Sequence, residues 1–306
     1  MIELKEERLE GTYIYPDGEP RGFVTLLRTD PVTGSTVRIT GRRPMDPASV
    51  ERELPDLAGR VALTQKDCPF CEGNVERMTP QFLPEIVAEG RIRRGAAWVF
   101  PNLMPYGRHS AVCLFSLDHH IPLGEFTHRQ FADALQACCE YLDAVRGFDP
   151  ESCFQVITQN VLPASGGALL HPHLQVNVDP VAMTYHRYLL RHDAAFLEEL
   201  AAVELAGPRF IRAAGRWVFF AAFAPLAAWE VHAVCRRRSR FSELTAEDVS
   251  DFVSGVLDIH AFYRADAKNS ANMGIFGTTD GRHALFARVM ARSTWRPWYR
   301  SDRSAY

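Results

Sequence analysis

The sequence reads His-Pro-His-Leu-Gln at residues 171–175, and apolar Val176 and Val178 follow. Alternate side chains of an extended strand share one face, so we predict that the two imidazoles and the carboxamide point the same way. A neutral imidazole can attack phosphorus, and an amide can hydrogen-bond a phosphoryl oxygen. The stretch therefore predicts a strand over residues 170–178 that carries a phosphate-handling site.

His173 is the predicted nucleophile of this site. An imidazole has an ordinary pKa of about 6.5, so it is largely neutral near pH 7 and needs no strong base to attack. Gln175 is the second predicted catalytic residue, because its amide can stabilise the phosphoryl group during transfer. The alternative is that these side chains only pack or face solvent.

Cys68 and Cys71 form a Cys-x-x-Cys pair, which supplies two of the four ligands of a tetrahedral zinc ion. The sequence contains no second pair of this spacing, so histidines must complete the set. We predict His119 and His171, with His120 as an alternative to His119. One structural Zn²⁺ bound in this way would join three distant segments and orient the strand of His173. The competing interpretation is a reduced cysteine pair without metal.

The composition indicates an ordinary globular protein. With a net charge of −3, the chain of 306 residues has no global positive field to recruit nucleic acid. No apolar run approaches the roughly 20 residues of a membrane helix, and the charged N-terminus does not resemble a signal peptide. Seven cysteines without an export signal fit a reducing compartment. These features predict a cytoplasmic protein without a nucleic-acid or membrane partner.

The hydrophobic pattern predicts the elements of the first half. Residues 1–20 read as an irregular arm, and residues 21–41 as a hairpin that turns at the Pro/Gly cluster of residues 30–34. A helix over Thr127–Val145 begins at an N-cap threonine. Strands are predicted over residues 96–100, 111–115, 152–159 and 170–178.

The second half repeats this plan. Residues 215–219 echo residues 96–100, Thr245 opens a second long helix, and two strands follow over residues 273–276 and 285–290. A repeat spaced by about 120 residues indicates two copies of one α+β unit rather than a solenoid. We assign residues 1–185 to the first unit and residues 186–306 to the second. The second unit lacks the catalytic histidines, and the repeat places Phe286 and Arg288 opposite His171 and His173.

Six segments of the chain, in order, resemble the galactose-1-phosphate uridylyltransferase family of the histidine-triad superfamily, which includes ADP-glucose phosphorylase-like relatives. The segments are Arg28–Gly34, Cys68–Asn74, Val99–Asn102, Phe115–His119, Asn160–Gln175 and Pro225–Glu230. The resemblance runs from about Arg28 to Ser293, most of the protein. It implies two histidine-triad-like units in tandem, each a mainly antiparallel sheet with packed helices, and a homodimer.

The resemblance also implies a reaction. His173 would take a nucleoside monophosphate from a nucleoside diphosphate sugar, as a covalent nucleotidyl-histidine, and pass it to a phosphate or sugar phosphate. The residues expected to bind the substrate are Arg28, Arg42, Arg43, Asn102, Asn160, Ser165, Gly166 and Gly167.

The chain departs from the family pattern beside the motif. Residues 157–162 lack a carboxylate, a cation and a glycine of that pattern, and Ala168 stands where a polar residue is expected. The base, sugar and acceptor therefore stay open. A phosphorylase or hydrolase of a dinucleotide or another nucleotide anhydride is one alternative, and a non-catalytic nucleotide-binding protein is another.

Overall fold

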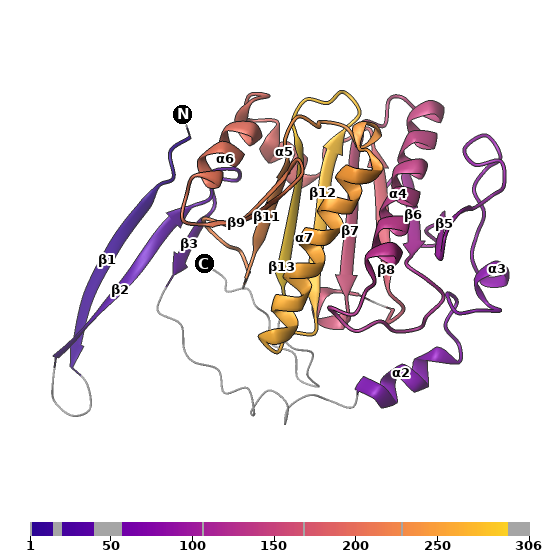
Figure 1. Cartoon of the computed structure of the whole chain (residues 1–306), viewed down its shortest axis with the longest axis horizontal. Coiled ribbons are helices and arrows are strands. Elements are labelled where there is room, and N and C mark those ends of the chain that lie inside the picture. Colours follow the sequence, from indigo (N-terminus) through magenta and orange to yellow (C-terminus); the bar gives the residue numbers. More distant parts are fainter. Residues whose placement is uncertain are drawn as a thin grey trace.

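The computed structural model describes residues 2–14, 20–39, 57–105, 107–167, 169–227 and 229–292. Two of the predicted substrate-binding residues, Arg42 and Arg43, lie outside these ranges. Figure 1 shows one large sheet with two long helices in front of it and a small sheet that extends from one end. The α+β prediction is confirmed.

Ten strands of the described chain form the large sheet, in the order β4-β5-β6-β8-β7-β12-β13-β11-β10-β9, and neighbouring strands are antiparallel. Their bounds are β4 (Ile92–Arg94), β5 (Ala97–Pro101), β6 (His109–Leu114), β7 (Phe154–Val161), β8 (His173–Asp179), β9 (Phe210–Ala214), β10 (Trp217–Ala221), β11 (Val231–Cys235), β12 (Ala271–Thr278) and β13 (Leu285–Ala291).

The strand order is symmetric about its middle. From the outer edge inward the first half runs β4-β5-β6-β8-β7, the second half runs β9-β10-β11-β13-β12, and the halves meet where β7 pairs with β12. The predicted boundary between residues 185 and 186 falls inside helix α5 (Thr184–Leu189). Tyr185 of this helix stacks on Phe276 and Phe286 of the second half. That boundary stays a prediction.

Two helices cover one face of the sheet, α4 (His128–Phe148) in the first half and α7 (Ala246–Ala265) in the second (Figure 1). Each begins at a threonine that closes a capping box, Thr127 with Gln130 and Thr245 with Asp248. Both helices were predicted, and both are confirmed. Their buried faces and the apolar side chains of the strands beneath them form the main core.

A pair of glycines fixes the correspondence between the halves. Gly95 and Gly215 both have positive φ, and a Cβ atom at either would collide with an aspartate six residues after the cap of the covering helix, Asp133 or Asp251. Glycine is needed there for both its backbone conformation and its missing side chain.

This correspondence corrects the repeat alignment. Leu114 on β6 pairs with His173, and Val234 on β11 pairs with Phe286, so Phe286 is the counterpart of His173 and Arg288 that of Gln175. The alignment predicted from the sequence was two residues out at β13. It was one residue out at β10, where it matched Trp98 to Trp217, although these side chains pack in different clusters.

The N-terminal residues form a separate three-stranded sheet of β1 (Glu6–Ile14), β2 (Pro20–Thr29) and β3 (Thr36–Ile39). The hairpin predicted over residues 21–41 is confirmed, and the Asp30 carboxylate accepts hydrogen bonds from two backbone amides in its turn. The prediction of an irregular arm over residues 1–20 was wrong, because residues 6–14 pair along β2. Residues 6–10 are mostly charged, so they gave no apolar stripe to recognise as a strand.

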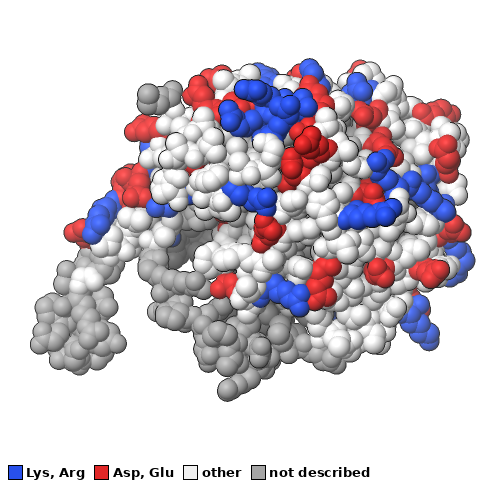
Figure 2. All heavy atoms as spheres, in the orientation of Figure 1, with Lys and Arg blue, Asp and Glu red and all other residues white. Residues whose placement is uncertain are grey.

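Short helices complete the fold: α2 (Leu57–Gln65), α3 (Val75–Met78), α6 (Phe196–Leu205), and the 3₁₀ turns η1 (Pro163–Ser165) and η2 (Phe241–Glu243). Helices α5 and α6 bury the face of the second half that α7 leaves open. Among the described residues, no helix combines the length and apolar character of a membrane span. Acidic and basic side chains are interspersed on the face in Figure 2.

Two helical glycines give a test of this packing. A Cβ atom at Gly255 in α7 would overlap the ring of Phe219, whereas one at Gly147 in α4 meets open space. We expect Gly255→Ala to lower the free energy of unfolding by about 1–3 kcal/mol through overpacking. Gly147→Ala, the matched control, should raise it by about 0.5–1 kcal/mol. Urea denaturation measures both, and equal effects would contradict the packing of α7 on β10.

Candidate active site and metal centre

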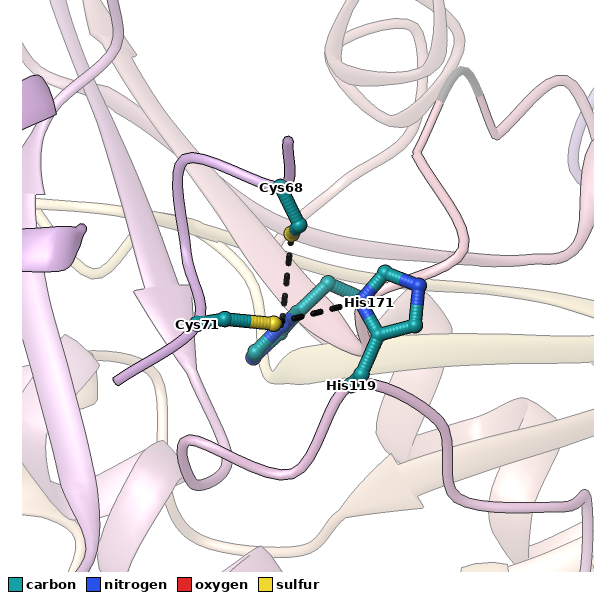
Figure 3. A group of neighbouring side chains, drawn as sticks. All are labelled: Cys68, Cys71, His119 and His171. Carbon is teal, nitrogen blue, oxygen red and sulfur yellow. Dashed lines mark hydrogen bonds between the residues drawn. The ribbon is translucent and has the colours of Figure 1, made fainter. Parts of the chain in front are cut away.

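Four side chains converge beside the start of β8. Cys68, Cys71, His119 and His171 each offer one ligand atom, and these atoms all lie within 4.8 Å of one another (Figure 3). The Sγ atoms of Cys68 and Cys71 lie 3.7 Å and 3.8 Å from Nδ1 of His171. Nδ1 of His119 lies 3.3 Å from Sγ of Cys71. This Cys₂His₂ cluster could hold a metal ion.

The hydrogen bonds of both rings leave the clustered nitrogens unprotonated. Nε2–H of His171 donates to the carbonyl of Ser116 at 3.0 Å, so Nδ1 keeps its lone pair. Nε2 of His119 lies 3.0 Å from the hydroxyl of Thr64, which itself donates to the carbonyl of Arg60 and therefore accepts from the ring. A metal-ligating histidine characteristically donates its other N–H in this way.

Burial shifts the pKa of three of these groups, Cys71, His119 and His171. It raises the pKa of the Cys71 thiol to about 12, with a further contribution from the neighbouring Cys68. It also lowers the pKa of His171 to about 4 and lowers that of His119. Neutral imidazoles are ready to bind a cation, and a bound dication would offset the cost of two thiolates at one place.

The structure distinguishes the two adjacent histidines. His119 belongs to the cluster, whereas His120 lines a small cavity that His171 and His173 also line. Three groups around the cluster were not predicted: the Thr64 hydroxyl, the Ser116 carbonyl and the Phe70 ring, which meets His171 and His173 edge-on at 5.8 Å. A hydroxyl and a carbonyl so far away in the chain leave no signal in the sequence.

The strand that carries the motif begins later than predicted. It starts at His173, so His171 is not part of the ladder and turns toward the cysteines instead of sharing a face with His173 and Gln175. His173 and Gln175 do share a face, which is opposite to that of Leu174 and Val176 in the helix-covered core. The His171 side chain is held instead by its hydrogen bond to the Ser116 carbonyl and by its contacts with Cys68 and Cys71.

One hydrogen bond sets the state of the His173 ring. Its Nδ1 lies 2.8 Å from the carbonyl oxygen of His171, which can only accept, so Nδ1 carries the proton. Nε2 is then the basic nitrogen, and it has no hydrogen-bond partner in the described part of the chain. Burial lowers the pKa of His173, which favours the neutral ring. The ring therefore presents a lone pair at Nε2.

A small cavity lies beside this ring. Its lining comes from three segments: His120, Ile121, Phe126, Gln159, Asn160, Val161, Leu162, Leu170, His171, Pro172 and His173. Asn160, on β7, accepts a hydrogen bond from Nδ2 of Asn272 through its Oδ1 atom, which orients its own amide nitrogen. Gln175 is half-buried on β8 between Val112 and Thr158 of the neighbouring strands. The structure thus brings Asn160 and Gln175 to His173.

The loop that includes η1 uses its own polar groups. The amide of Gly166 donates to Pro163, and that of Gly167 donates to Leu162. The Ser165 hydroxyl also bonds loop carbonyls, at 2.7 Å and 2.9 Å. Substrate binding by Ser165, Gly166 and Gly167 stays a prediction, and it would require these amides to exchange partners.

Two other predicted binding residues lie farther from His173. Nε of Arg28 donates to Glu6 at 2.6 Å and its Nη1 to the carbonyl of Phe223, so the structure places it with the N-terminal sheet and the second half. In Figure 1, β2 and β8 are well separated. Asn102 follows β5 and bonds Ser110, toward the far end of β8 from His173.

The second half has an ion pair where the first half has its motif. Arg288, the counterpart of Gln175, donates through Nε to Glu230 at 2.7 Å, and Nε2 of His232 lies 3.0 Å from the same carboxylate. Burial opposes ionisation of Glu230, but the bonds from His232 and Arg288 outweigh it and lower the pKa of Glu230 to about 2. These charges are paired with one another rather than presented to a ligand.

Comparison with known protein families gives no match, because no family model matches the chain. An uncharacterized protein of Archaeoglobus fulgidus is 30% identical over 312 residues, which cover 98% of this chain and 91% of the relative. The chain belongs to the family of this archaeal protein.

Solved structures share the fold. An ADP-glucose phosphorylase from Arabidopsis thaliana with bound ADP-glucose has a TM-score of 0.64 at 17% identity, covering 89% of this chain and 91% of that one. A GalT-like protein from the same plant has a TM-score of 0.67 at 18% identity, covering 87% and 88%. A uridylyltransferase reaches 0.57 at 19% identity, covering 87% and 85%. These likenesses confirm the resemblance to the galactose-1-phosphate uridylyltransferase family at the level of the fold.

Adjacent histidines test the metal centre. We expect purified wild-type protein to carry about one tightly bound metal ion per chain, as the donor set of a closed tetrahedral site implies. His119→Ala should lose the ion and lower the thermal midpoint, while His120→Ala should keep it. Elemental analysis by mass spectrometry measures the content. Equal metal content in the two variants would refute the assignment of His119.

Proposed function

We propose that this protein is a nucleotidyltransferase that moves a nucleoside monophosphate from a nucleoside diphosphate sugar to a phosphate or sugar phosphate. The observation that carries the proposal is the hydrogen bond from Nδ1–H of His173 to the carbonyl of His171. It leaves Nε2 as a nucleophile beside the cavity that Asn160 also lines. Fold similarity to an ADP-glucose phosphorylase and a uridylyltransferase supports the choice of substrate class.

The transfer has two displacement steps. In the first, Nε2 of His173 attacks the α-phosphorus, a P–N bond forms, and the bond from that phosphorus to the bridging oxygen breaks. The sugar 1-phosphate leaves with the bond electrons. In the second, an oxygen of the acceptor phosphate attacks the same phosphorus, and the P–N bond electrons return to Nε2. The His171 carbonyl faces the ring N–H throughout, and its dipole stabilises the positive charge that the ring acquires.

Two amides are placed to stabilise the phosphoryl oxygens. Gln175 lies two residues after His173 on the same face of β8, and its side chain has no hydrogen-bond partner in the described residues. Asn160 has its oxygen engaged by Asn272, so its nitrogen is the atom free to donate to an anion. Such preorganised donors contribute most where charge develops during the transfer.

We propose that the Cys₂His₂ cluster binds one structural Zn²⁺. Tetrahedral zinc with ordinary bond lengths separates its sulfur and nitrogen ligands by about 3.6 Å. The observed Sγ–Nδ1 distances of 3.3 Å, 3.7 Å and 3.8 Å fit this value. A bound zinc ion would supply structural cross-linking rather than Lewis acidity, because four protein ligands leave no open position. It would hold His171, whose carbonyl orients the nucleophile.

The acceptor remains a choice between inorganic phosphate and a sugar phosphate. Arg28, Asn102, Ser165, Gly166 and Gly167 stay predicted contacts of the substrate. The homodimer also stays a prediction.

A labelling experiment tests the nucleophile. We expect the protein, incubated with α-³²P-labelled ADP-glucose or UDP-glucose, to form an acid-labile, alkali-stable nucleotidyl-protein. His173→Asn should form none, because the amide cannot attack phosphorus. His128→Asn, at an exposed histidine that bonds Ser250, is the matched control and should label normally. Failure of the wild type with every nucleoside diphosphate sugar tested would leave a binding protein as the better interpretation.

A second substitution tests the role of Gln175. Removing one preorganised donor to a developing oxyanion typically lowers kcat by about 100- to 1,000-fold. We expect this loss for Gln175→Ala, with little change in KM, and none for the control Gln136→Ala, a half-buried glutamine of α4 that bonds Arg94 on the helix-covered side of the sheet. Steady-state kinetics with phosphate as acceptor measure both parameters. An effect on KM alone would mean that Gln175 only binds the ground state.

A further inference from the structure

Asn177 is a buried amide that the fold leaves unsatisfied. It lies on β8 four residues after His173, so it shares the face of His173 and Gln175. Only 9% of the residue is exposed, and its Oδ1 is buried with no hydrogen-bond partner. An unpaired buried polar group costs stability, and an apolar side chain of similar shape would avoid that cost. The packing of the strand therefore does not account for an asparagine here.

Polar and apolar groups gather around this amide. Asn177 pairs with Ser110 on β6, and within the described ranges the Ser110 hydroxyl receives one long bond, of 3.4 Å, from Nδ2 of Asn102. On the other side it pairs with buried Val156 of β7. The residue after Asn102 is Leu103, which is 74% exposed. A planar heterocycle requires hydrogen-bonding groups for its edge and apolar surface for its faces.

The spacing along β8 relates this group to the nucleophile. Four residues of a strand span about 13 Å, so side chains at His173 and Asn177 can reach opposite ends of a ligand lying along the strand. Gln175 stands between them. A nucleotidyl group whose phosphorus is on Nε2 of His173 would pass Gln175 and bring its base toward Asn177. This step rests on the proposed function.

We propose that Asn177, together with Ser110, recognises the hydrogen-bonding edge of the nucleobase. A carboxamide presents a donor and an acceptor side by side, and nucleobase edges present the complementary pair, as in bidentate contacts of asparagine with adenine. The ligand supplies the partner that Oδ1 lacks within the described residues. Asn177 is thus a specificity residue, not a catalytic one.

The test compares nucleotides with a ligand that has no base. AMP, UMP, GMP, CMP and ribose 5-phosphate are titrated by calorimetry against the His173→Asn variant, which cannot form an adduct. The same titrations are made after Asn177→Leu or Asn177→Ala is added to that variant. We expect both substitutions to weaken the preferred nucleotide about tenfold, the size of one lost base contact. The other nucleotides should change less, so selectivity falls. Affinity for ribose 5-phosphate should not change.

Stability separates a ligand contact from a packing role. Asn177→Leu removes an unsatisfied amide while keeping the volume, so its thermal midpoint should equal or exceed that of wild type even as selectivity falls. An equal loss of affinity for all five ligands, or unchanged selectivity among the nucleotides, would overturn the inference. The labelling of His173 is read separately. Normal labelling with unchanged selectivity in Asn177→Leu would leave the proposed function standing and remove only this residue's role.

Discussion

One histidine connects the Cys₂His₂ cluster to the ring of His173. Nδ1 of His171 faces the thiols of Cys68 and Cys71, its Nε2–H is held by the Ser116 carbonyl, and its own carbonyl receives the Nδ1–H of His173. The side chain and backbone of one residue therefore determine where the His173 ring lies and which of its nitrogens is free. Any change that moves His171 changes the tautomer or the direction of His173. This arrangement positions the Cys-x-x-Cys segment, the loop at Ser116 and β8.

The duplicated architecture explains how such a site can occupy one half only. Both halves retain the capped helix, and a glycine under it allows the sheet and helix to approach closely. On the opposite face the halves differ: Gln175 is half-buried without a partner among the described residues, whereas Arg288 is bound to Glu230 and covered by helix α5 through Tyr185. An ion pair buried in this way satisfies its own charges, and removal of one partner would leave the other charge buried without compensation.

Local patterns predicted much of the fold. The helices after Thr127 and Thr245 follow from capping chemistry and from apolar periodicity, both of which act over a few residues. The chelating pair of Cys68 and Cys71 is equally local. The N-terminal strand was missed because its partner, not its own pattern, makes it a strand. The repeat was recognised, but its register was not, because Trp98 and Trp217 lie at similar places in the sequence but pack in different clusters.

The sequence by itself determined which chemical groups this protein owns: an imidazole pair, an amide and two thiols at spacings that few other functions require. Tertiary structure decided which of His119 and His120 turns toward the thiols, that His171 leaves the ladder before β8 begins, and that Arg28 lies with the second half. The physical reason is the distance along the chain over which each interaction acts. Spacing along a strand or within the Cys-x-x-Cys segment is set by local backbone geometry. The orientation of a ring is set by hydrogen bonds to carbonyls and hydroxyls up to 55 residues away in the chain.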